Sequence, residues 1–227
     1  MGTSKGYIMP TKKHWTEAKR AATQLMKDNN ASNREKLIKK YAIAMQKDNE
    51  EGKKSTRAIK SIIALSQSIS SKGVAQTLKN IKKEYLTDKT SEEILEILLN
   101  EYTGYGDLID NNLELHAISI AFKELNIKKL EDLGNIPVET LLKEIIIEYI
   151  DQNFKFRFEE KINKGKTPEE CKKIINDISG YMRNKLTEEL DVSGVNAIDF
   201  TNLQNDRIIE DKITEAYEIF KKLYGEE

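Results

Sequence analysis

The chain has few of the residues on which most catalytic and metal sites depend. Its 227 residues include one cysteine, Cys171, and two histidines, His14 and His116, which lie far apart in the sequence. A single cysteine excludes a disulfide within the chain and fits a reducing, cytoplasmic environment. One cysteine and two histidines are fewer than the four Cys and His ligands of the usual structural zinc site, so we expect no bound metal and no cofactor.

Residues that interrupt regular structure are also scarce, and so are long apolar runs. Three prolines and 11 glycines leave long uninterrupted stretches, which favour helix over sheet. No run approaches the roughly 20 apolar residues of a membrane span, and the N-terminus lacks the apolar core of a secretory signal. We therefore expect a cytoplasmic, all-α protein that forms a multi-helix, bundle-like domain.

No motif for enzymatic chemistry emerges. The run Lys164-Gly165-Lys166-Thr167 resembles the end of a phosphate-binding P-loop, but Glu160 stands where that motif requires glycine. Cys171 is predicted in the first turns of a helix, where a thiol pKa can fall. It also lies on the apolar side of that helix, which favours core packing. We therefore predict that the protein is not an enzyme.

Charge divides the chain into two halves of opposite sign. Residues 1–89 hold 20 Lys and Arg against 8 Asp and Glu, a net of +12, whereas residues 90–227 hold 17 against 30, a net of −13. We expect a flexible N-terminal tail at 1–13, a basic helical subdomain at 14–89 and an acidic one at 90–227, and the last two can also form one domain. The basic half can meet nucleic acid, or it can dock on the acidic half of the same chain or of a second copy.

Several helix boundaries are predicted from local patterns. Trp15 opens the first helical pattern and is interpreted as a packing anchor where the tail leaves the core. Asp48 to Lys54 is read as a polar loop. The next helix is expected to fray through Ser66 to Ser68, and the helix after Gly73 is expected to carry Tyr85 on its inner face. Thr90-Ser91-Glu92-Glu93 fits a capping box at the start of another helix. A long helix is expected over Val138 to Ile162, and Thr167-Pro168-Glu169-Glu170 combines a capping box with proline at the first helical position. The inward positions expected in the helix that follows are Cys171, Ile174, Ile175, Ile178, Met182 and Leu186.

The N-terminal segment carries the most specific signal. Gly2 behind Met1 permits removal of the initiator, which would leave an unhindered α-amine with a pKa of about 8, partly neutral at pH 7. Myristoylation prefers Ser or Thr at position 6, where this chain has Gly6. An inert terminus is the alternative, because glycine is common at position 2 and most termini carry no function.

The opening Met1-Gly2-Thr3-Ser4-Lys5-Gly6-Tyr7, followed by Pro10 and Trp15, resembles that of the QatB proteins of bacterial anti-phage Qat systems. Later segments are similar in character: Ile136-Pro137 before a long helix, and Ala197-Ile198-Asp199-Phe200 before a terminal helix. The spacer Lys12-Lys13-His14 departs from the Gly/Pro-rich character we expect of the family.

The resemblance implies partners and a site. Its expected partners are a QueC-like enzyme, an ATPase and a TatD-like nuclease, with nucleic acid left open and no membrane. It suggests that the QueC-like enzyme offers an activated 7-deazaguanine carboxylate to the Gly2 amine. The residues expected to be modified or bound by this partner are Gly2, Thr3, Ser4, Lys5, Gly6 and Tyr7.

Overall fold

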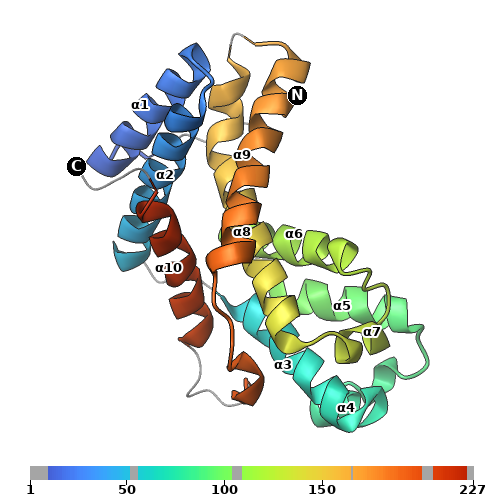
Figure 1. The fold of residues 1–227 in the computed structure, drawn as a ribbon. Helices are drawn as coiled ribbons and strands as arrows, with labels where there is room; N and C mark the ends of the chain where they lie inside the picture. The colour runs from blue at the N-terminus through green and yellow to red at the C-terminus, as the bar shows by residue number, and fades with distance from the viewer. Residues whose placement is uncertain (1–9, 52–55, 104–108, 165, 201–206, 224–227) are drawn as a thin grey trace. The chain divides into compact units, whose positions relative to one another are not determined.

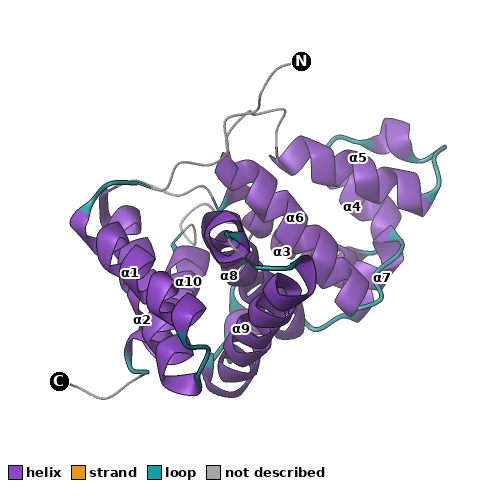
Figure 2. Cartoon of the chain, turned by 90° about the horizontal axis from the view of Figure 1, so that it is seen from above, coloured by secondary structure: helices purple, strands orange, loops and turns teal. Residues whose placement is uncertain are grey.

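A computed structural model describes residues 10–51, 56–103, 109–164, 166–200 and 207–223. Across these residues the secondary structure is helical and contains no strand, which confirms the predicted all-α class (Figure 2). The predicted flexible tail lies outside the described residues up to residue 9. The α-helices are α1 (Lys13–Lys27), α2 (Ala31–Glu51), α3 (Arg57–Lys72), α4 (Val74–Asn80), α5 (Ser91–Thr103), α6 (Ile109–Glu124), α7 (Leu130–Asn135), α8 (Val138–Asn163), α9 (Pro168–Glu189) and α10 (Ile208–Lys221).

The chain forms two compact units that alternate along the sequence. The first unit contains Met1–Lys53, Ile150–Leu190 and Ile213–Glu227, and the second contains Lys54–Tyr149 and Asp191–Lys212. Each unit therefore takes residues from both the basic and the acidic half of the sequence. The boundary near residue 89 marks the change from net positive to net negative charge along the sequence. Its role as a subdomain boundary stays a prediction.

Five aromatic side chains form the centre of the first unit. Tyr41 of α2 contacts Phe154 of α8 and Tyr217 of α10 edge to face, with ring centroids 5.3 and 5.8 Å apart. Trp15 of α1 packs on Phe158 with centroids 6.3 Å apart. All five rings are fully buried. This aromatic cluster joins helices from three separate stretches of the sequence (Figure 1).

The second unit packs around α3. The hydroxyl of Ser66 is fully buried and donates to the carbonyl of Leu133 in α7, at 2.8 Å. A Cβ on Gly134 would stand 2.7 Å from the Ile69 side chain, so α7 approaches α3 this closely only with glycine there. Sequence patterning placed the fraying end of α3 at Ser66 to Ser68. That expectation is wrong: α3 continues to Lys72, and the polar Ser66 is accommodated inside the fold because its hydroxyl has a buried acceptor.

The capping box predicted at Thr167 is confirmed. The Thr167 hydroxyl accepts from the Glu170 backbone N–H at 3.3 Å, and the Glu170 carboxylate accepts from the Thr167 N–H at 2.9 Å. The six apolar side chains predicted to face inward from α9 are all buried. The long helix α8 extends one residue beyond its predicted end at Ile162.

Two expectations are corrected. The helix after Gly73 ends at Asn80, and Tyr85, expected on its inner face, is 65% exposed. The predicted polar loop at Asp48 to Lys54 begins too early, because α2 continues to Glu51. None of the helices in the described ranges combines the length and the apolar character that crossing a bilayer requires.

Candidate functional site

The described structure shows how the root of the N-terminal segment is held. Gly2, Thr3, Ser4, Lys5, Gly6 and Tyr7, the residues expected to be bound or modified, lie outside the described residues. The described chain begins at Pro10, three residues before α1. Contacts of residues 10–15 therefore carry the structural information about this site.

Three donors from this root converge on one carboxylate, that of Asp48 near the end of α2. The Trp15 indole Nε1 donates to Asp48 Oδ2 at 2.8 Å. His14 Nε2 lies 3.1 Å from Asp48 Oδ1, and Lys12 Nζ donates to the same oxygen at 3.2 Å. We call this group, Lys12, His14, Trp15 and Asp48, the Asp48 clamp.

The electrostatics of the clamp favour an ionised Asp48. Burial is the largest single influence and acts to raise the pKa of this carboxyl group. Hydrogen bonds from Trp15, His14 and Lys12 together outweigh burial, so the pKa lies below its ordinary value. The carboxylate therefore stays charged at neutral pH and binds all three donors.

Further contacts fasten the same segment to the first unit. Lys19 Nζ donates to the backbone carbonyl of Pro10 at 2.9 Å. The Arg157 guanidinium of α8 lies over the Trp15 ring, 5.7 Å from its centroid, and donates to Asn153 Oδ1 at 2.8 Å. Trp15 is fully buried, which confirms its interpretation as a packing anchor. The chain from Pro10 to Trp15 is thus attached to α1, α2 and α8.

Sequence reasoning missed Asp48 because it placed this residue in a loop. Its partners lie 33 to 36 positions away, and no local spacing links them. The local sequence, Lys47-Asp48-Asn49-Glu50-Glu51, holds two further acidic residues and so does not single out Asp48.

The other chemistry-bearing residues that the structure describes lie on separate helices, apart from one another in the sequence. Within the ranges that the structure describes, no group of three or more His, Cys, Asp or Glu side chains is arranged to hold a metal ion. His116 is exposed on α6, remote in sequence from the Asp48 clamp. Cys171 is 5% exposed, and its thiol lies 3.7 Å from the Ile162 carbonyl, as expected for core packing.

A second region forms where two distant segments meet on α3. The side-chain amide of Gln67 donates to the Ile198 carbonyl at 2.6 Å and accepts from the Phe200 N–H at 3.2 Å. A cavity of about 480 Å³ lies beside this contact, and Ile136 and Pro137 help to line it. The structure thus brings together Ile136-Pro137 and Ala197-Ile198-Asp199-Phe200, which the sequence presents 60 or more positions apart.

Comparison with known proteins identifies one family. A family model described as QatB, Qat anti-phage system associated protein QatB, matches residues 50–220, which is more than half of the chain. No curated protein and no solved structure matches the chain.

Proposed function

Because this chain belongs to the QatB family of Qat anti-phage system associated proteins, we propose that it acts through its N-terminal segment, which a QueC-like partner binds and modifies at Gly2. Membership makes the chain a component of anti-phage defence that works with partner proteins. The identity of the partner, the modified residue and the absence of catalytic activity in this chain are parts of the proposal.

The Asp48 clamp is the observation that carries this proposal. It fixes the chain from Lys12 to Trp15 to a folded body, so the segment ahead of it has a defined origin. Gly2 to Met9 is eight residues, which span at most about 29 Å when fully extended. A segment of that length would let the α-amine reach the active site of a partner docked near α1 and α2.

The chemistry suits a glycine amine. The partner activates the carboxylate of a 7-deazaguanine with ATP. The neutral Gly2 amine attacks the activated carbonyl carbon, an amide bond forms, the activating group leaves, and the amine loses a proton. Glycine suits this role because it has no side chain to obstruct the approach. Thr3 and Ser4 would supply hydrogen bonds to the partner, and Lys5 would contact phosphate or acidic side chains.

Intact-mass measurement tests the proposal. We expect the chain co-expressed with the QueC-like enzyme of its own system to lose Met1 and to gain the mass of an acyl-linked 7-deazaguanine. Fragmentation should place the added mass on Gly2. The chain expressed alone, and a Gly2→Leu variant expressed with the partner, are the controls and should carry no adduct. An unmodified Gly2 in the presence of active partner would contradict the proposal.

Three expectations stay predictions: nucleic-acid binding by the basic N-terminal half (residues 1–89), docking on an ATPase or a TatD-like nuclease, and a cytoplasmic location. Binding of DNA or RNA that weakens steeply with added salt would support a nucleic-acid-binding module. Self-association between the basic and acidic halves would also weaken with salt, but it would appear as a change in oligomeric state without nucleic acid.

A further inference from the structure

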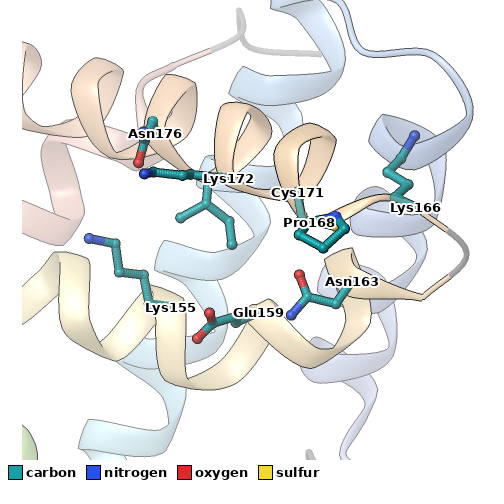
Figure 3. Close-up of a pocket in the computed structure, with 9 residues that line it drawn as sticks. Lys155, Glu159, Asn163, Lys166, Pro168, Cys171, Lys172 and Asn176 are labelled. Atoms are coloured by element: carbon teal, nitrogen blue, oxygen red, sulfur yellow. The ribbon is translucent and has the colours of Figure 1, made fainter.

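A second, independent site lies in the first unit, between the end of α8 and the start of α9. A cavity of about 570 Å³ opens there, within the range of roughly 300 to 1,000 Å³ typical of small-molecule sites. The α8 wall consists of residues four positions apart, which share one helix face. The lining residues are Lys155, Glu159 and Asn163 of α8, Lys166 of the connection, and Pro168, Cys171, Lys172, Ile175 and Asn176 of α9 (Figure 3).

The sequence around this cavity has a net positive charge, although it lies in the acidic half of the chain. Residues 155–176 contain seven Lys and Arg against four Glu, a net of +3, within a half of the chain whose net charge is −13. Burial lowers the pKa of the nearby Lys161 ammonium most, and the positive charges of Lys164 and Lys19 lower it further. A local positive field in an acidic half is suited to an anionic ligand.

Two lysines stand at one end of the cavity. Figure 3 shows the ammonium groups of Lys155 and Lys172 at the same end, with Lys166 at the other. The buried carboxylate of Asp151 accepts from Lys155 Nζ at 2.6 Å and so positions this ammonium. An ammonium has three donors, and two remain for another acceptor. With Asp151 counted beside Glu159, the three lysines still leave a net charge of +1.

The lysines, and not the helix end, would recruit the anion. The start of α9 is already occupied, because the Glu170 carboxylate accepts from the Thr167 N–H and the Thr167 hydroxyl accepts from the Glu170 N–H. An added phosphate would have to displace that carboxylate from the helix N-terminus. Lys172, by contrast, can bind a phosphate beside Lys155 without breaking an ion pair that the described structure contains.

The remaining lining residues select more than a bare anion. Pro168, Cys171 and Ile175 supply an apolar surface for a flat ring. The Glu159 carboxylate accepts hydrogen bonds, and the Asn163 and Asn176 amides both donate and accept them. A nucleotide has each matching part: a phosphate, a planar ring, and hydroxyl or amino donors. We propose that this cavity binds a nucleotide, with its phosphate at Lys155 and Lys172.

Binding of ATP, GTP, CTP and UTP to the purified full-length chain, measured by calorimetry, tests the proposal. We expect at least one of the four to bind, and inorganic phosphate and the corresponding nucleoside to bind at least tenfold more weakly, since each supplies only part of the contacts. Cys171 gives a second readout, because it lines the cavity and is the only cysteine of the chain. Bound nucleotide should slow its alkylation by iodoacetamide, followed by mass.

Matched variants make the result specific. Lys172→Glu should weaken binding about tenfold or more, because it replaces a charge-assisted contact with the phosphate by repulsion. Lys166→Glu acts at the other end of the cavity and should weaken binding by less, but by more than about twofold. Lys173→Glu and Lys164→Glu make the same charge change beside the cavity, on residues that do not line it, and should leave binding within about twofold. The proposal would be overturned by equal weakening in all four variants or by no binding of any nucleotide at millimolar concentration. It would also be overturned if hexaglutamate, an acidic peptide, bound more tightly than every nucleotide.

Discussion

At the scale of single residues, Asp48 connects the N-terminal segment to the folded body. Its carboxylate receives hydrogen bonds from Trp15, His14 and Lys12, and its side chain is 22% exposed. Hydrogen bonds to a charged group contribute more than neutral ones, and partial exposure reduces that contribution. One ionised side chain therefore binds three donors from the root of the segment.

Asp48→Asn should lower the free energy of unfolding by about 1 kcal/mol at pH 7. Because the folded-state pKa of Asp48 is lowered, the stabilisation is complete above the unfolded value of about 3.9 and is lost as the pH falls through the folded-state pKa. The difference between the variant and the natural chain should therefore shrink on acidification. Urea unfolding at several pH values, followed by the fluorescence of Trp15, measures both effects.

Asp88→Asn is the matched control for this prediction. Asp88 is exposed, and the same change there should alter stability by less than about 0.5 kcal/mol. Equal stability of the natural chain and the Asp48→Asn variant at pH 7 would show that the clamp contributes nothing to folding.

At the scale of elements, helix ends and helix interiors use glycine in opposite ways. Gly73 has φ +78° where α3 gives way to α4, a conformation that a residue with a Cβ adopts only with strain. Gly180 lies inside α9 with helical geometry, and a Cβ there would meet nothing within 4 Å. Gly73 is required by its backbone conformation, whereas Gly180 weakens α9.

Substitution by alanine should therefore change stability in opposite directions. Gly73→Ala should destabilise the fold by about 1 kcal/mol or more, through backbone strain. Gly180→Ala should stabilise it by about 0.5 to 1 kcal/mol, because alanine loses less entropy in a helix. Thermal or urea unfolding of the two variants measures both signs, and a shift in the same direction for both would contradict this account.

At the scale of the whole molecule, both units are built from segments that are distant in sequence. In the second unit, Gln67 of α3 binds the backbone of Ile198 and Phe200, more than 130 positions away. One side-chain amide here supplies both a donor and an acceptor to an extended segment. The position of that segment thus depends on tertiary structure.

Gln67→Ala should release this segment. We expect faster hydrogen exchange at the Phe200 amide and a loss of about 1 to 2 kcal/mol in the free energy of unfolding, because a backbone donor and acceptor lose their partner. Gln76→Ala is the control, since Gln76 is exposed and bonds only Asn80, one turn along α4. Unchanged exchange at Phe200 in the Gln67→Ala variant would refute the role assigned to this amide.

The sequence alone determined the features that depend on residues a few positions apart, namely helix starts and the buried faces of helices. Apolar spacing placed the buried side chains of α9, and the patterns at Thr90 and Thr167 located helix starts, because a capping box closes within four residues. The all-α class followed from the scarcity of interrupting residues, and the burial of Trp15 from its place at the start of an apolar pattern.

Tertiary structure alone decided where distant groups meet. The convergence on Asp48, the pairing of Gln67 with residues 198–200, and the continuation of α3 through Ser66 all involve partners 33 or more positions away. Periodicity carries no information about such partners, because it reports only which face of a helix is apolar. The sequence therefore does not distinguish a polar side chain that contacts water from one that donates to a buried acceptor.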